Sequence, residues 1–344
     1  MKKKTSVYIL RAILFSGTFI SLYFVPWILI KAWILPLPNN IEGQLEQSLN
    51  FGFDGMIVYV EEAGKEPQMY AAGWHNKEMK IPAKPDALFC IASITKLYVA
   101  VAITKLTHEN KIDLQKSVAS YFPEYIGHIE YADQITIEML VKHRSGIPNF
   151  TDQNEFWQNP PSNRDGAIAY VLDLPANFKP NTSYGYSNTN YLLLAKLIEK
   201  ITGKDQFYYI KEKILQPLGL TDTYGSNKDL DLDRVMSGYY VGIDKDQKHK
   251  DQGMFATAHD VAVFLRALND GTVFQSDEQE TYSSLYEYNH TGLAAGYQSI
   301  AKYHEDIDTV VIQFNNTTDF NGYQWNLAEI AYSRILKIIR KNKS

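Results

Sequence analysis

The run from Ser93 to Leu106 is apolar on nearly every side, and it constrains the fold more than any other stretch of the chain. A helix that is hydrophobic all round is buried on every side. Its first turn carries a serine and, three residues later, Lys96, and side chains at i and i+3 share one helical face. We therefore expect a rigid central helix that opens with a serine and a lysine side by side.

This pair suits nucleophilic chemistry. A serine hydroxyl is a poor nucleophile until a neighbour takes its proton, and a desolvated lysine with a lowered pKa can do so. The residues expected to desolvate the amine are apolar: Ile91, Ile94, Leu97 and Tyr98. The spacing is weak evidence by itself, because Ser299 and Lys302 repeat it. That second pair falls in a stretch that reads as a strand, where i and i+3 point to opposite faces and cannot cooperate.

Composition limits the class of protein and its partners. A chain of 344 residues with 45% hydrophobic content can bury a large core. The formal net charge is −5 and no basic run occurs outside the N-terminus, which argues against nucleic acid as a partner. The single cysteine, Cys90, excludes an internal disulfide and a cysteine-based metal site, and we expect it to be a small core residue.

The N-terminus predicts a membrane anchor. Residues 12–30 carry no charge and as a helix would span about 28 Å, close to the thickness of a bilayer core. Basic residues before this run outnumber Lys31 after it, which places the N-terminus in the cytoplasm and the rest outside. A retained anchor is favoured over a cleaved signal peptide, since the run is long and no small-x-small cleavage site follows it. Residues 1–40 thus form the cytoplasmic end, the anchor and a stiff linker.

Hydrophobic periodicity places strands near both ends of the chain and helices between them. The expected strands are 55–61, 68–74, 293–302 and 309–314, and the expected helices are 41–49, 93–106, 135–142, 165–172, 188–201, 206–215, 255–268 and 326–339. Thr257 is the expected N-cap of one helix and Gly271 its terminator. This order predicts an α/β domain over 41–344, with one sheet assembled from both chain ends (about 41–108 and 250–344) and an inserted all-helical lobe (about 109–249). A site would lie in the groove between the lobes.

Two further motifs fall where that architecture would bring them to the groove. Tyr186-Ser187-Asn188 precedes an expected helix and is the only Tyr-x-Asn in the chain. His290-Thr291-Gly292 leads into the strand that is expected to begin at Leu293. Each has an ordinary structural alternative, as a helix N-cap, an anchor between lobes or a turn. Together with the serine–lysine pair they are much harder to attribute to structure alone.

With these motifs the sequence resembles the serine β-lactamase and penicillin-binding protein superfamily, in the branch that groups class C β-lactamases with D,D-peptidases and related esterases. The resemblance covers about residues 41–340. It includes 140–147, similar to the leucine-rich His-x-Ser-Gly stretch before the second motif, and 253–260, similar to the Gly-x-x-Ser/Thr-x-x-Asp helix start. The resemblance therefore implies a β-lactamase-like α/β fold, an antiparallel sheet flanked by helices from both chain ends with an inserted all-helical lobe.

The resemblance implies a role for each matching residue. Ser93 would form an acyl-enzyme, while Lys96 and Tyr186 would shuttle the proton, the tyrosine acting as its anion or as a hydrogen-bonded relay. Substrate would be bound by the rest of the motifs and the residue that follows: Asn188, His290, Thr291, Gly292 and Leu293. Backbone N–H groups of Ser93 and Leu293 would form an oxyanion hole, and Gly292 would let the strand approach the substrate. His143 would be structural. No metal and no cofactor is implied.

The expected function is that of a single-pass, membrane-anchored serine hydrolase with its catalytic domain outside the cytoplasm. Its substrate would be a small-molecule or cell-wall-derived ester or amide, such as a D-Ala peptide or a D-alanyl ester. Class C β-lactamases usually carry lysine where this chain has His290, and a mostly neutral histidine would attract the carboxylate of penicillins less strongly. A β-lactamase proper and a catalytically silent penicillin-binding sensor remain alternatives.

Two unrelated hydrolase classes are disfavoured by the absence of their motifs. The eight histidines include no His-Glu-x-x-His pair, which argues against a metal hydrolase. The chain contains no Gly-x-Ser-x-Gly elbow, which argues against an α/β-hydrolase.

Overall fold

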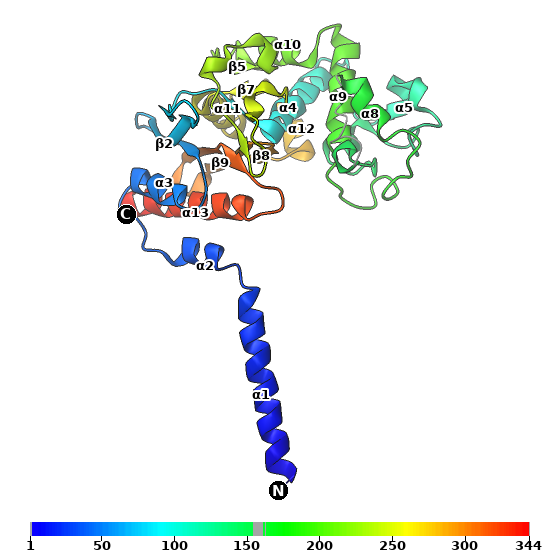
Figure 1. Cartoon of the computed structure of the whole chain (residues 1–344). Coiled ribbons are helices and arrows are strands. Elements are labelled where there is room, and N and C mark those ends of the chain that lie inside the picture. The colour runs from blue at the N-terminus through cyan, green and yellow to red at the C-terminus, as the bar shows by residue number, and fades with distance from the viewer. Residues whose placement is uncertain (1, 154–160, 162, 344) are drawn as a thin grey trace.

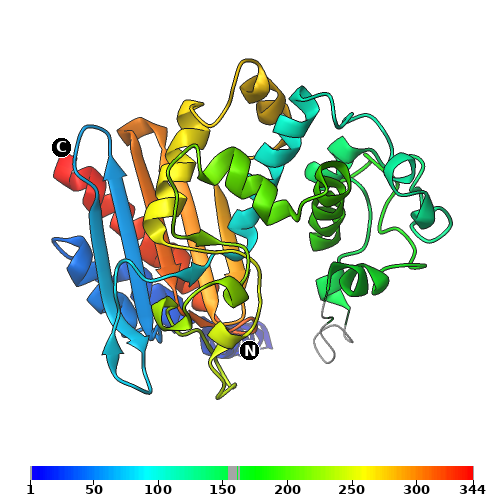
Figure 2. The same ribbon diagram turned by 90° about the horizontal axis from the view of Figure 1, so that it is seen from above.

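The central feature of the fold is a six-stranded antiparallel sheet of order β3-β2-β1-β10-β9-β8. The computed structural model describes residues 2–153, 161 and 163–343. The strands of this sheet are β1 Gly55–Glu62, β2 Gln68–Asn76, β3 Ile81–Pro82, β8 His290–Ala294, β9 Tyr297–His304 and β10 Thr309–Asn315. The two ends of the chain meet where β1 pairs with β10, and the helical lobe lies beside the sheet (Figure 2). The α/β architecture expected from the sequence is confirmed.

Helices cover both faces of the sheet, and the alternation of β1 assigns its side chains to two cores. Met56, Val58 and Val60 pack in the core that includes α3 (Ile41–Leu49) and α13 (Gln324–Lys343). Ile57 and Tyr59 belong to the larger core, which includes α4 (Thr95–His108) and α11 (Ala258–Asp270). The three motifs singled out in the sequence lie on the side of this larger core.

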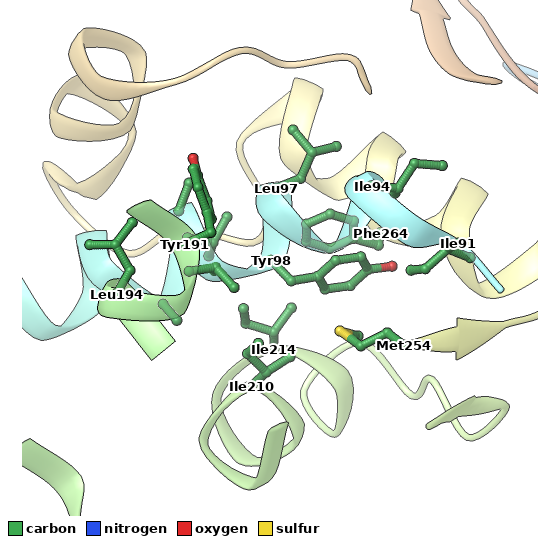
Figure 3. Packing of buried hydrophobic residues seen from close by; sticks show 14 of the residues in the cluster. Ile91, Ile94, Leu97, Tyr98, Tyr191, Leu194, Ile210, Ile214, Met254 and Phe264 are labelled. Carbon is green, nitrogen blue, oxygen red and sulfur yellow. The ribbon is translucent and has the colours of Figure 1, made fainter. Parts of the chain in front are cut away.

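Helix α4 is buried on all sides, as its sequence predicts. Each of its residues from Lys96 to Leu106 is buried. Tyr98 stacks on Phe264 of α11, and the helical lobe contributes a further wall of side chains (Figure 3): Tyr191, Leu194, Ile210 and Ile214. The central helix therefore joins the two lobes.

Most of the remaining helices belong to the helical lobe, and all of those named here except α9 are short. They are α5 Val118–Tyr121, α6 Ile137–Val141, α8 Arg164–Ala169, α9 Asn188–Thr202, α10 Gln206–Ile210 with its π-helical continuation Lys211–Leu215, and α12 Glu278–Leu285. Single 3₁₀ turns include η1 Ala92–Ile94, η2 Pro123–Tyr125 and η3 Phe150–Asp152. Thr257 caps α11 by accepting a hydrogen bond from the Asp260 N–H, and Gly271 ends the helix in the left-handed region, as expected.

Several short strands were not predicted. They are β4 Phe89–Cys90, β5 Thr223–Tyr224, β6 Tyr239–Tyr240, β7 Phe255–Ala256 and β11 Thr317–Thr318. β5 pairs with β7 and β6 pairs with β11, so the stretch 109–249, expected to be all-helical, contains two strands that join the α/β part. Two-residue strands are too short to produce a period-2 pattern, which is why the sequence does not predict them.

The expected strand over 293–302 is instead a hairpin. β8 begins at the third motif and ends at Ala294, and β9 returns along it after a turn. Gly296 has φ +79°, a conformation that a tight hairpin turn requires and that glycine adopts without strain. The prediction of one strand was wrong because the apolar residues continue through the turn. Cys90 is buried in the core, as predicted.

The N-terminal region also differs from its prediction, which was a single helix through 12–30. Helix α1 (Lys2–Tyr23) ends before Pro26, and α2 (Trp27–Ile34) begins after it. Proline lacks the N–H that a continuing helix needs and disfavours helical backbone in the residue before it. No single helix among the described residues is long and apolar enough to cross a membrane. The two segments Leu14–Tyr23 and Trp27–Ile34 are long and apolar enough when taken together, but they meet at a bend of 76°. In Figure 1, α1 leads away from the domain and α2 lies next to α13.

A buried ion pair ties α4 to α12 and gives the first prediction. Lys105 Nζ lies 2.8 Å from Glu278 Oε2, both side chains are less than a tenth exposed, and the amine also donates to the Val273 carbonyl. Lys105→Met should leave the buried carboxylate unpaired and lower the free energy of unfolding by about 3–5 kcal/mol. Urea unfolding followed by circular dichroism measures this loss. The pair of Lys111, which is exposed, and Glu109, which is half-buried, is the control nearer the surface, and Lys111→Met should cost about 1 kcal/mol or less. Equal losses in the two variants would contradict the assignment.

Candidate active site

The proposed nucleophile lies on a tight turn at the start of the central helix. Ser93 is in η1, and α4 begins two residues later. Strand β8 packs directly against this turn: a β-carbon on Gly292 would lie 2.3 Å from Ser299 Oγ and 2.4 Å from the Ile91 carbonyl oxygen. Glycine is therefore needed at 292 for β8 to pack against the nucleophile turn. The role expected from the resemblance, approach of the strand to the substrate, stays a prediction beside this packing requirement.

Ser93 Oγ stands between the two predicted proton-transfer groups. Lys96 Nζ lies 3.0 Å from it, and the Tyr186 hydroxyl donates to it at 2.8 Å. Lys96 Nζ also donates to Asn188 Oδ1 at 2.8 Å. The first two motifs thus meet at one oxygen atom, although they are about ninety residues apart in the sequence.

The environment of Lys96 favours its neutral amine. The side chain is buried, and its Nζ lies 5.0 Å from the ring centroid of Tyr186 and 5.4 Å from that of Tyr191. Burial lowers the pKa of the amine from 10.5 to about 7. Burial also raises the pKa of Tyr186 to about 12. Of the two states considered for Tyr186, the neutral, hydrogen-bonded relay is therefore favoured over the anion, and Lys96 is the group able to accept the serine proton.

Helix α9 positions Asn188 at its first residue. The Asn188 N–H donates to Asn149 Oδ1 at 3.0 Å, and its side-chain amide donates to Thr151 Oγ1 at 3.3 Å. These two bonds leave Asn188 Oδ1 directed to Lys96. A neutral amine that donates to Asn188 presents its lone pair to other partners, and the Ser93 hydroxyl can then donate to it.

His143 holds the second motif in place. Its Nδ1 accepts a hydrogen bond from the Ser187 N–H at 3.2 Å, and its ring lies 4.5 Å from that of Tyr186. Burial, followed by the charges of Lys96 and His290, lowers the pKa of His143 to about 3, so the ring is neutral. The expected structural role is consistent with this geometry, and the loop that it fixes is the one that carries Tyr186.

Both nitrogens of the His290 ring are occupied within the protein. Nδ1 lies 2.5 Å from the Thr291 carbonyl oxygen, to which it must donate, and Nε2 then accepts from the Tyr286 hydroxyl at 2.9 Å. Burial lowers the pKa of His290 to about 4, despite the opposing effect of the Thr291 bond. At neutral pH this residue therefore carries no charge and has no N–H directed to a ligand.

The rest of the third motif lies along an exposed edge of the sheet. β8 is the outermost strand of the sheet, so backbone groups on its outer side have no partner strand within the described part of the chain. Thr291 is half-buried, and the side chain of Leu293 is 44% exposed. An edge strand beside the nucleophile can supply backbone N–H groups to a carbonyl oxygen, which is the role expected of Leu293.

Three residues with clear positions in this site were not predicted. Tyr286 fixes His290, Tyr191 covers Lys96, and Asn149 orients Asn188. None is part of a spaced motif, and this chain contains 24 tyrosines, so residue type gives no signal. Only the three-dimensional contacts identify them.

Comparison with known proteins gives the same family as the motifs. The model of the family described as "Beta-lactamase" matches residues 43–328. The chain is 24% identical over 279 residues to an N-acetylmuramyl-L-alanine amidase of Bacillus subtilis, covering 68% of this chain and 63% of the relative. It is 26% identical over 285 residues to Penicillin-binding protein 4* of the same organism, covering 80% and 60%. The chain thus spans less than two thirds of the length of these curated relatives.

Solved structures show that the fold is shared. D-amino acid amidase from Ochrobactrum anthropi SV3, in a complex with L-phenylalanine amide, superposes with a TM-score of 0.77 at 23% identity, covering 90% of this chain and 99% of that one. A penicillin-binding protein from Bacillus halodurans superposes with a TM-score of 0.75 at 17% identity, covering 87% and 100%. The expected β-lactamase-like fold is confirmed.

The geometry around Ser93 predicts how its reactivity depends on pH. Because the amine must be neutral to accept the proton, labelling by a fluorophosphonate should rise with pH through about 7 and then level off, falling about tenfold per unit well below that value. Initial labelling rates between about pH 5.5 and about pH 9 measure this profile. Ser93→Ala should abolish labelling and Ser299→Ala should not. The assignment would be refuted if labelling persisted in Ser93→Ala, or if the labelling rate did not change with pH.

Proposed function

The chain belongs to the beta-lactamase family, and we propose that it is a membrane-anchored serine hydrolase that cleaves an extracytoplasmic ester or amide through an acyl-enzyme. The observation that carries this proposal is that Ser93 Oγ lies within hydrogen-bonding distance of both Lys96 Nζ and the Tyr186 hydroxyl. A buried neutral amine beside a hydroxyl is the arrangement that activates a serine.

In the first half of the reaction, Ser93 Oγ adds to the substrate carbonyl carbon while its proton passes to Lys96 Nζ. The bond from that carbon to the leaving oxygen or nitrogen then breaks. The proton reaches the leaving group through the Tyr186 hydroxyl, which is hydrogen-bonded to Oγ in the free enzyme. Water then repeats the same steps on the acyl-enzyme and releases the acid and Ser93. No metal or cofactor takes part in this scheme.

The charge around the site supports a substrate without a carboxylate beside the scissile bond. His290 is neutral and has both ring nitrogens engaged, so it cannot pair with a carboxylate. After burial, the negative charge of Glu287 is the next factor that raises the pKa of Tyr184. A neutral or cationic group would be accepted more readily here than the anion common to penicillins.

The names of related proteins are compatible with this class of substrate. One curated relative is called an N-acetylmuramyl-L-alanine amidase, and one structural neighbour is called a D-amino acid amidase. D-Ala peptides of the cell wall and D-alanyl or other esters are therefore the candidates. Intact-protein mass spectrometry after incubation with a labelled penicillin and with a panel of neutral esters and amides tests the proposal, because it traps the acyl-enzyme. If no covalent adduct forms with any of these compounds, the result would instead support a catalytically silent module.

Position 290 gives a prediction about selectivity. His290→Lys would add a cation, and a charged hydrogen bond contributes about 1 kcal/mol more than a neutral one, or several-fold in rate. The variant should gain about fivefold in kcat/KM on a carboxylate-bearing cephalosporin relative to a neutral ester. His290→Gln, which also replaces the ring but adds no charge, is the control and should give no comparable gain in this ratio. If the wild-type protein already prefers the cephalosporin and the lysine variant gains nothing, charge at 290 does not set selectivity.

The anchoring part of the proposal rests on the apolar N-terminal region and the basic residues that precede it. The domain is expected outside the cytoplasm, so protease added to intact spheroplasts should digest the chain beyond Asn39. A separate, tagged protein of the cytoplasm serves as the control for lysis and should stay intact. If the domain is fully protected while this control protein is also intact, the proposed orientation is wrong.

A further inference from the structure

Helix α2, between α1 and the catalytic domain, is apolar on two opposite sides. Its sequence, Trp-Ile-Leu-Ile-Lys-Ala-Trp-Ile, contains one charge. Ala32 is buried, and Leu29 packs against the core formed with α3 and α13. Trp27, Ile30 and Ile34 are exposed, and at 100° per residue they share the face opposite to Ala32. A helix that is apolar all round requires an apolar environment on both sides.

The inner side of α2 is fixed to the domain by Arg334 of α13. This guanidinium is buried and donates to the backbone carbonyls of Trp33, Leu35 and Pro36, where α2 ends. It also donates to Gln44 Oε1 and Gln47 Oε1 of α3. All five donors of the guanidinium are thus used. The segment after α2 is held against the domain by these bonds.

The outer side of α2 continues into other exposed aromatic and aliphatic side chains. Trp33 is 64% and Ile34 69% exposed, and Tyr23 and Phe24, at the bend before α2, are 85% and 73% exposed. A groove between α2 and α13 is lined by Leu29, Ile30, Trp33 and Ile34 on one side and by Asn326, Glu329, Ile330 and Ser333 on the other. Contiguous exposed apolar surface of this kind marks an interaction site.

The composition of this surface points to lipid. Tryptophan and tyrosine gather at the membrane–water interface, and lysines beside them attract anionic headgroups. Lys31 is exposed on α2, and Lys337 Nζ lies 5.4 Å from the ring centroid of Trp33. Helix α1 meets α2 at a bend of 76°, so a helix inserted along the bilayer normal would be followed by one lying nearly in the bilayer plane.

We propose that α2 lies in the headgroup region of the bilayer into which α1 inserts, with Trp27, Ile30 and Ile34 reaching the upper acyl chains. This inference rests on the proposed anchoring and goes beyond it, because a simple anchor would leave the domain on a tether. Because Arg334 fixes the end of α2 to α3 and α13, a contact of α2 with lipid would also fix the orientation of the whole domain. Since α2 packs on the α13 side of the sheet and Ser93 lies on the other side, the docked enzyme holds its serine away from the lipid surface.

The test separates α2 from α1 after insertion of the full chain. A site-specific protease sequence is inserted after Tyr23, and the protein is reconstituted into vesicles of phosphatidylcholine with phosphatidylglycerol. After cleavage, the fragment that carries α2 and the domain is measured in the vesicle pellet and in the supernatant. We expect it to stay with the vesicles and to be released by high salt or by vesicles without phosphatidylglycerol, because Lys31 and Lys337 lose their partners.

Matched substitutions locate the contact. Ile34→Asp should lower the bound-to-free ratio of the cut fragment about tenfold or more, because an apolar side chain leaves the lipid and a charge takes its place. Ile126→Asp changes a side chain of similar exposure, 61%, in the helical lobe and should have no effect. Both positions are exposed, so folding and fluorophosphonate labelling of the two variants should match those of the parent.

The outcomes separate this inference from the anchoring on which it depends. If the uncut protein does not sediment with vesicles, the anchoring fails and α2 docking fails with it. If the uncut protein sediments but the cut fragment is released under all conditions, the anchoring stands and α2 docking is wrong. A cut fragment that is released as a stable dimer would show that a second copy, and not lipid, covers this face.

Discussion

The site depends on one constraint: the Lys96 amine is buried, and no carboxylate of the described residues pairs with it. The aromatic rings that cover it come from the helical lobe, and the turn that bears Ser93 is held by β8 of the sheet. The low pKa therefore exists only when both lobes are in place. In the unfolded chain the amine binds a proton below about pH 10.5, and in the folded one below about 7. Between these values the unfolded chain holds the extra proton, so the contribution of Lys96 to stability rises with pH across that window and is smallest below pH 7.

Sequence patterns predicted the parts of the fold that extend over long runs of residues or that begin at a recognisable helix cap. The Thr257 cap is present because threonine is a preferred N-cap residue type. The buried helix from Ser93 and the helix at Asn188 are present, because a run of ten or more residues averages out local exceptions. The hairpin at Gly296 and the break at Pro26 were missed for the same reason, since each is a local backbone event inside an apolar run.

The site was predictable where residues act through spacing and was not where they act through contacts. The serine, lysine and tyrosine of the first two motifs meet at one oxygen atom, as the resemblance implied. The properties of His290 depend on Tyr286, which donates to Nε2 and so fixes the proton on Nδ1. A sequence shows that a histidine is present. It does not show which of its atoms are free, and that decides whether the residue can bind an anion.

The sheet separates the two surfaces that the chain presents, and the register of β1 controls both. Met56, Val58 and Val60 face the core under α13, on which α2 and its exposed apolar side rest, whereas Ile57 and Tyr59 face the core that surrounds α4. A slip of one residue in β1 would exchange these faces. The pairing of Met56 with Asn315 at one end of β1 and Glu62 with Thr309 at the other holds the register over the full length of the strand. The same backbone ladder that closes the sheet between the two chain ends therefore keeps the surface next to α2 and the serine turn on opposite sides of one layer.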